Sequence, residues 1–196
     1  MPYGKFESIA EVARKFDIEV SGNRSFVERL QIEIPDYDLK RIAKKLTDDL
    51  SFINETTIFE RIISPILEIV SEQYTLLKIW SHVPYNVDQE KGLVGEPDYL
   101  VAPRTKYGDM GIPPLCIIEA KKDNFEEGWT QALAEMVAAS FQGANACYGI
   151  VTTGKIWEFV KLEQGMFTRD PQQISATREL QLIFDSLNWI FNKIDH

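Results

Sequence analysis

Two short apolar segments carry charged residues of kinds that could bind a metal ion. In "GEPDYLVAP", residues 95–103, Asp98 stands directly before the apolar run, and in "LCIIEAKK", residues 115–122, Glu119 and Lys121 stand at its end. If the second segment is a β-strand, Glu119 and Lys121 point to the same side, because side chains alternate along a strand. A carboxylate and an ammonium group would then emerge together at the end of this strand.

The linker between the two segments predicts that they pair. It reads "APRTKYGDMGIPP" and holds enough glycine and proline to turn the chain back. In the resulting antiparallel pair, Asp98 would lie beside Glu119 and Lys121. Two carboxylates held this close repel each other unless one is protonated or a cation lies between them, and hard oxygen ligands suit Mg²⁺. We therefore expect Asp98 and Glu119 to bind a metal that activates water or stabilises a phosphoryl oxygen, with Lys121 orienting the water.

Hydrophobic periodicity predicts the elements that must position these residues. Helical spacing appears over residues 54–72, 126–144 and 176–194, and strand candidates cover 76–85, 97–102, 115–122, 147–153 and 156–162. The order is α, β, β, β, α, β, followed by a further strand and helix. Three consecutive strands predict an antiparallel meander, and a crossover helix brings the next strand in parallel. The fold class is thus α/β at the boundary with α+β, with a mixed sheet flanked by helices.

The first 50 residues predict an appended α+β piece. Helical spacing covers residues 5–16 and 36–50, and "RLQIEI", residues 29–34, alternates as a strand with one exposed face would. We expect residues 1–50 to form an N-terminal extension packed on the core and residues 51–196 to form the main domain.

The charged segments and their flanking helices resemble the PD-(D/E)XK nuclease superfamily. Its motif would be carried here by Pro97-Asp98 and by Glu119-Ala120-Lys121. The segments "NETTIFERIISPIL", "WTQALAEM" and "GIVTTGKIWEFVKL" are similar to the nuclease domain of type I restriction enzyme motor subunits. This resemblance covers about residues 54–162. It implies a restriction endonuclease-like core of order αβββαβ that hydrolyses phosphodiester bonds with a metal ion.

The resemblance also implies an acid from the first helix and a glutamine from the second. The acid could be Glu55 or Glu60. Steps of three and four residues from Glu55 reach the apolar stripe Ile58, Ile62, Ile66 and Ile69, whereas Glu60 falls about 140° round the helix from Glu55. We choose Glu55 as a further metal ligand, although an acid in a first turn is also favourable through the helix dipole alone. Gln131 matches the family's glutamine, which binds near the attacking water or the scissile phosphate; an ordinary exposed glutamine is the alternative.

The formal charge of −9 and the pI near 4.8 argue against a general basic surface for nucleic acid. Contact with DNA is therefore expected to be local. One side of the helix over residues 36–50 and the loop after residue 103 offer cations: Lys40, Arg41, Lys44, Lys45, Arg104 and Lys106. The alternative for both groups is an ordinary solvated surface.

Histidine and cysteine usage points away from other chemistries. His82 lacks a second histidine or thiol at ligand spacing, so we expect it to be structural and not a zinc ligand. Cys116 and Cys147 each lie in an apolar run, which is typical of buried thiols in a reducing compartment. The sequence shows no cationic leader, and no apolar stretch approaches the roughly 18 residues of a membrane span. We expect a soluble, cytoplasmic protein without a membrane partner.

The sequence thus predicts a Mg²⁺-dependent endonuclease-like protein that hydrolyses DNA, of restriction, repair or mobile-element type, with Mn²⁺ able to substitute. It could act alone, as a homodimer, or within a larger restriction or repair complex. The first alternative is a catalytically inactive module of the same fold that binds nucleic acid or a protein partner. A weaker alternative makes Lys121 a Schiff-base lysine acting on a small molecule.

Overall fold

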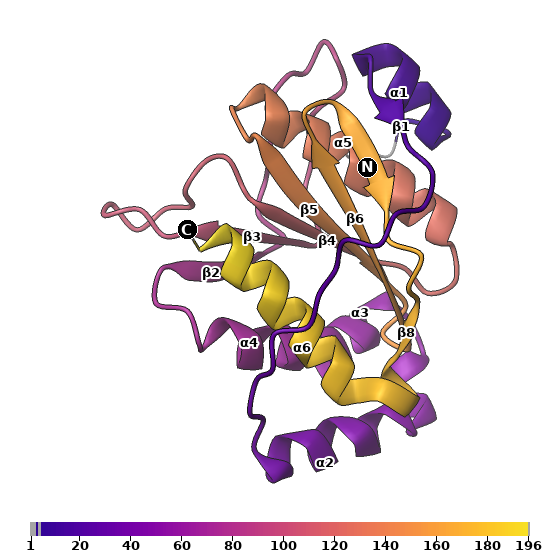
Figure 1. Ribbon diagram of the computed structural model, residues 1–196, viewed down its shortest axis with the longest axis vertical. Helices are drawn as coiled ribbons and strands as arrows, with labels where there is room; N and C mark the ends of the chain where they lie inside the picture. Colours follow the sequence, from indigo (N-terminus) through magenta and orange to yellow (C-terminus); the bar gives the residue numbers. More distant parts are fainter. Residues whose placement is uncertain (1–2, 4, 196) are drawn as a thin grey trace.

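One mixed β-sheet forms the middle of the molecule (Figure 1). The computed structural model describes residue 3 and residues 5–195. The strands run in the order β1-β7-β6-β5-β4-β3-β2, and β8 pairs with β6. Their bounds are β1 (Glu19–Val20), β2 (Leu77–Ser81), β3 (Tyr99–Pro103), β4 (Cys116–Ala120), β5 (Ala146–Thr152), β6 (Ile156–Glu163), β7 (Met166–Arg169) and β8 (Ile174–Ser175).

The centre of the sheet has the predicted connectivity. Strands β2, β3 and β4 form an antiparallel meander in which Tyr99 lies opposite Ile118. Helix α5 (Phe125–Phe141) then crosses over, so β5 joins β4 in parallel, and β6 returns antiparallel to β5. The αβββαβ order and the mixed α/β class with flanking helices are therefore confirmed.

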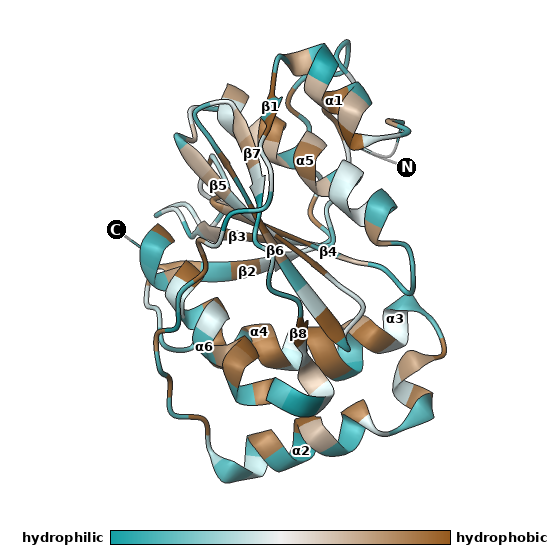
Figure 2. Cartoon of the chain, turned by 45° about the vertical axis from the view of Figure 1, so that its right-hand side comes forward, coloured by the Kyte–Doolittle hydropathy of each residue, from teal (hydrophilic) through white to brown (hydrophobic). Residues whose placement is uncertain are grey.

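Helices cover both faces of the sheet. Helix α1 (Ile9–Phe16) lies with α5 on one face. The other face is covered by α2 (Asp36–Leu46), η1 (Asp49–Phe52), α3 (Glu55–Ile58), η2 (Phe59–Ile63), α4 (Ser64–Ser71) and α6 (Ala176–Ile194). Strands that are buried on both faces are rich in apolar residues, and Figure 2 shows β3 and β4, the most completely buried strands, mostly in brown. In β4, Ile117 points to the α5 face, whereas Cys116 and Ile118 join the core on the opposite face.

The helix predicted over residues 54–72 is continuous but irregular. Asn54 caps its start, because its side chain accepts a hydrogen bond from the backbone of Thr57 at 2.9 Å. Residues 59–63 form one π-helical turn between α3 and α4. Single π-helical turns within α-helices occur frequently at functional sites.

The strand predicted over residues 29–34 is wrong. This segment is extended, but its backbone bonds to α6 and not to a strand: Leu30 N–H donates to the carbonyl of Asp185 at 3.1 Å, and the Asn188 side chain donates to the carbonyl of Leu30 at 3.0 Å. Alternating apolar residues report which side is buried, and they carry no information on the hydrogen-bonding partner. Of the three apolar residues in this segment only Ile32 is buried, whereas Leu30 is exposed and Ile34 is half-buried.

The remaining N-terminal elements attach to both faces of the sheet. Helix α1 packs on α5, β1 runs parallel to β7, and α2 packs on α6 and η2. The helix predicted over residues 36–50 ends at Leu46, and Asp48 caps the short 3₁₀ turn η1 that follows. The boundary after residue 50 stays a prediction. Among the described helices, none has the length and apolar content that a bilayer crossing requires.

Candidate active site

Asp98 and Glu119 are locked together across the ladder between β3 and β4. The backbone N–H of Ala120 donates to Asp98 Oδ2 at 2.8 Å, and the backbone N–H of Asp98 donates to Glu119 Oε1 at 3.3 Å. Each carboxyl group is thus held by the strand that carries the other. Asp98 precedes β3 and Glu119 lies at the end of β4, so both side chains gather at one edge of the sheet.

Lys121 completes this group. Its Nζ lies 3.6 Å from Glu119 Oε2 and 4.0 Å from Glu127 Oε1, and its side chain is only 12% exposed. The start of α5 packs closely over it, because a Cβ on Gly128 would lie 3.2 Å from Lys121 Cγ and 2.6 Å from Val151 Cγ1. Only glycine allows the helix to approach this closely.

Burial dominates the electrostatics of the group. Glu119 is completely buried, and this burial, together with the charge of Asp98, raises its pKa to about 8. Burial also raises the pKa of Asp98, against the opposing effects of the Ala120 N–H and the Lys121 charge. For Lys121, burial lowers the pKa, but the surrounding carboxylates outweigh it and raise the pKa overall. The site therefore holds its ammonium group charged and tends to keep a proton on its carboxyls.

A third acid, Glu135, lies beneath the site and was missed from the sequence. It projects from α5, is fully buried, and its pKa is raised well above the usual value by burial and by the neighbouring Glu119 charge. The two glutamates lie within hydrogen-bonding reach, but that bond requires a proton on one of them. When both are ionised, Glu119 Oε2 and both oxygens of Glu135 have no hydrogen-bond partner among the described residues. The available signal was an acid inside the apolar helical run "ALAEMVAAS".

Glu55 lies at the start of α3 and reaches the site electrostatically. Its side chain is exposed, and its charge contributes to the raised pKa of both Asp98 and Lys121. Glu60 instead acts on Tyr99, whose pKa it helps to raise. Of the two candidate helical acids, Glu55 is therefore the one whose charge acts on Asp98 and Lys121, and its metal-binding role stays a prediction.

Gln131 is connected to the carboxyl pair only indirectly. It lines a surface pocket of about 420 Å³ together with Glu127, which is also the second partner of Lys121. Within residues 5–195 its side chain makes no hydrogen bond to Glu119 or Lys121. The structure thus places Gln131 on the rim of the site, and its predicted contact with water or phosphate stays a prediction.

The predicted DNA-contacting cations do not gather at the site. Arg104 and Lys106 follow the far end of β3, about 17 Å from the Asp98 end at the usual rise per residue. Lys106 stacks over Tyr107 there. The cations Lys40, Arg41, Lys44 and Lys45 lie on α2, which packs on α6 and η2, and Lys40 and Arg41 pair with acids of the same helix. Their role in DNA contact is untested.

His82 lies beside Asp98. It was predicted to lie within a strand over residues 76–85, but the observed strand ends one residue before it. Strand β2 ends at Ser81, and the His82 backbone N–H donates to the carbonyl of Asp98 at 3.1 Å. Its side chain is exposed, its ring contacts Phe59 and Tyr99, and its charge contributes to lowering the pKa of Asp98. Sequence reasoning missed this position because pairing across the sheet, and not spacing along the chain, brings it to the site.

The donor set fits Mg²⁺. Within the described part of the chain, no three His, Cys, Asp or Glu side chains are grouped so that they alone could hold a metal ion. Asp98 and Glu119 supply hard oxygen ligands, and Glu119 Oε2, when both Glu119 and Glu135 are ionised, has no hydrogen-bond partner among the residues that the structure describes. Mg²⁺ is commonly bound by one or two carboxylates and several waters, so a pair of carboxylates is sufficient.

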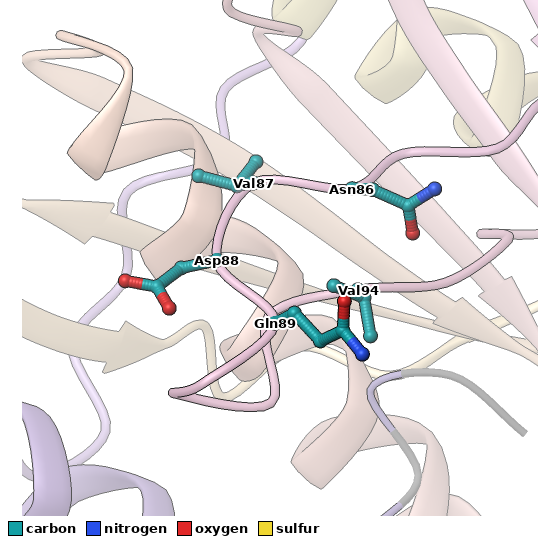
Figure 3. A pocket seen from close by; sticks show the side chains of 5 residues that line it. All are labelled: Asn86, Val87, Asp88, Gln89 and Val94. Carbon is teal, nitrogen blue, oxygen red and sulfur yellow. The ribbon is translucent and has the colours of Figure 1, made fainter.

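A second pocket, of about 490 Å³, lies over the loop between β2 and β3 (Figure 3). Its lining includes one acid, Asp88, which pairs with Lys91 at 2.5 Å. Asn86 supports the same loop by accepting a hydrogen bond from the Gly95 N–H at 2.9 Å. These polar groups hold the loop together, and they form no cluster comparable to the carboxyl pair.

Comparisons with known proteins support the fold. No model of a known protein family matches the chain, and neither does any curated protein. Among solved structures, it is similar to the cryo-EM structure of a DrdV–DNA complex, with a TM-score of 0.50 and 13% identity, covering 79% of this chain and 14% of that chain. The type IIG restriction endonuclease BpuSI follows with a TM-score of 0.49 and 13% identity, covering 87% of this chain and 18% of that one. A nuclease candidate of the DUF820 group from Anabaena variabilis ATCC 29413 has a TM-score of 0.34 and 12% identity, covering 74% and 70%.

At this identity the likeness to DrdV shows the fold alone, and the chain corresponds to a small part of the DrdV chain. The two lower TM-scores add no further argument. The finer resemblance to type I motor subunits stays a prediction.

Proposed function

We propose that this chain is a metal-dependent nuclease that hydrolyses DNA phosphodiester bonds. The observation that carries the proposal is the group of Asp98, Glu119 and Lys121 at one sheet edge, with two interlocked carboxyls and one buried ammonium. The similar DrdV structure is described as a complex with DNA, which supports DNA as the substrate class. Restriction, repair and mobile-element roles all fit this chemistry.

In this proposal Asp98 and Glu119 bind Mg²⁺, or Mn²⁺ in its place. Among the described residues Glu55 is not grouped with this pair closely enough to share a metal, so as a further ligand its exposed side chain would have to move towards Asp98 when the metal binds. A bound Mg²⁺ would stabilise charge on a phosphoryl oxygen and lower the pKa of a water molecule. Lys121 keeps its proton, because the surrounding carboxylates raise its pKa, so it can donate hydrogen bonds to the attacking water and to the developing negative charge. Gln131, on the rim, would orient the water or the phosphate.

The net charge of −9 and the dispersed cations suggest weak intrinsic affinity for DNA. They favour a nuclease that works as a homodimer or beside a DNA-binding partner. The same observations also fit the alternative function, an inactive module of this fold that binds nucleic acid or protein. Cleavage distinguishes the two.

The test is cleavage of plasmid DNA with Mg²⁺ or Mn²⁺ by the wild-type chain and by Asp98→Ala and Lys121→Ala. We expect nicking or linearisation by the wild type and a loss of about 100-fold or more in both variants. Lys91→Ala is a matched control, because Lys91 stacks on Phe141 at the far end of α5, about 25 Å along the helix from the site.

Mn²⁺ binding measured by calorimetry adds a readout independent of cleavage. Asp98→Ala should lose binding, whereas Lys91→Ala should retain it. Metal binding without cleavage under any salt or metal condition would favour the inactive module. Cleavage that survives both Asp98→Ala and Lys121→Ala would place the active site elsewhere.

A further inference from the structure

His82 has a backbone conformation that side chains other than glycine rarely adopt. Its φ is +49°, in the left-handed region, directly after β2. The hydrogen bond from its N–H to the carbonyl of Asp98 holds His82 beside Asp98, just beyond the ladder of β2 and β3. Strained residues of this kind persist where surrounding structure holds them, and they concentrate at functional sites.

The imidazole is held on one flank by two aromatic rings. The Phe59 ring meets it edge-on, with centroids 5.5 Å apart and planes at 89°, and the Tyr99 ring lies 6.3 Å away. Tyr99 is itself fixed by a 2.6 Å hydrogen bond with Ser64, and Phe59 belongs to the π-helical turn. The ring is therefore oriented by buried groups while the residue stays exposed to solvent.

No described residue accepts or donates a hydrogen bond at the ring nitrogens of His82. Because His82 is exposed, its ring nitrogens are open to water and to a bound ligand. Here an oriented imidazole with free nitrogens stands beside Asp98, close enough for its charge to act on that carboxyl group. Glu55, which also acts on Asp98, comes from the helix that continues into the π-helical turn.

We propose that His82 is a substrate-contacting residue whose imidazole donates a hydrogen bond to a non-bridging oxygen of the phosphodiester held at the Asp98, Glu119 and Lys121 site. This inference rests on the proposed function, and it adds a phosphate-binding group on the α3 side of the sheet edge. The aromatic flank orients the donor before the substrate arrives, which lowers the entropic cost of the contact.

The test uses His82→Asn and His82→Gly in the full chain. Both replacements tolerate a positive φ, so the folded backbone is retained and the midpoint of thermal unfolding should equal or exceed that of the wild type. We expect both variants to bind Mn²⁺ as the wild type does and to lose tenfold or more in kcat/KM for plasmid cleavage. Gln164→Asn is the matched control, because Gln164 has a φ of +51° in the turn between β6 and β7, and this change should leave cleavage unaltered.

Two outcomes of the cleavage assay would overturn the proposal. One is wild-type kcat/KM in both His82 variants. The other is loss of both Mn²⁺ binding and cleavage in the His82 variants. His82 would then act through Asp98 and the metal, and not through a contact with phosphate.

A second measurement separates failure of this inference from failure of the proposed function. The chain has two histidines, so His82→Asn identifies the His82 signals in an imidazole NMR spectrum. A short DNA duplex added with Ca²⁺ should shift them. If the wild type cleaves no DNA, the proposed function fails, and the shift then decides: a shift supports the phosphate contact, and its absence overturns it.

Discussion

Replacing Glu119 with glutamine should stabilise the metal-free protein at high pH. The pKa of Glu119 rises from 4.5 to about 8 in the folded chain, a change worth about 5 kcal/mol at about 1.4 kcal/mol per unit. Between these values the folded state holds a proton that the unfolded state has released, so folding stability falls as pH rises through this window. Glutamine keeps the shape and removes the titration. The cost of ionising Glu119 is coupled to the charges of Glu135 and Asp98, so removing Glu119 alone recovers only part of it. We expect the unfolding free energy of Glu119→Gln to exceed that of the wild type by about 2–5 kcal/mol at pH 8.5 and to differ little from it at pH 5.

The assay is urea unfolding followed by tryptophan fluorescence, with EDTA present, from pH 5 to pH 8.5. Glu90→Gln, an exposed change in the loop between β2 and β3, should show no such pH-dependent gain. Mg²⁺ should stabilise the wild type and have little effect on Glu119→Gln, because the metal offsets the charge that burial opposes. If the difference in unfolding free energy between Glu119→Gln and the wild type stayed constant from pH 5 to pH 8.5, this explanation would be refuted.

Three further predictions address the surroundings of the site. Lys121→Met should destabilise the metal-free chain by about 1–3 kcal/mol at pH 8 and by less at pH 5, where Glu119 is neutral, in the same urea assay. Gly128→Ala should lower the unfolding free energy by about 1–3 kcal/mol through overpacking, whereas Gly22→Ala, with open space around it, should be neutral in thermal unfolding. Burial raises the pKa of both Cys116 and Cys147, so neither thiol should react with Ellman's reagent at pH 8 until urea is added; rapid labelling of the native chain would contradict this.

The core of the fold could be predicted from the sequence because its signals are local. The closing helix was predicted over residues 176–194, which are the bounds of α6, and the three-strand meander followed from turn residues and alternation. The same alternation failed for residues 29–34, where the backbone bonds to a helix. Periodicity identifies a buried face, but pairing partners depend on contacts between distant parts of the chain.

The site was predictable to the same extent. Strand register brought Asp98, Glu119 and Lys121 together as expected, because antiparallel pairing leaves little freedom in where facing residues lie. Glu135 and His82 could not be placed in this way. The burial of Glu135 depends on how α5 sits on the sheet, and the position of His82 depends on a left-handed backbone that no residue pattern in "WSHVPY" signals.

The structure argues for a functional site independently of any family resemblance. Burying Glu119 and Glu135 beside a single ammonium group gives the fold no stability that apolar side chains would not supply better. The left-handed His82 and the π-helical turn at residues 59–63 depart from the regular geometry of the surrounding elements. His82 lies beside Asp98, and its ring contacts Phe59 of the π-helical turn. Buried charges and irregular backbone that occur together at one place, in an otherwise apolar and regular core, are expected where the residues are kept for binding or chemistry at a cost in stability. A divalent cation at Asp98 and Glu119 would replace the protons that burial favours on these carboxyl groups and would neutralise their charge once they ionise, which gives the burial of the carboxyl groups a physical explanation.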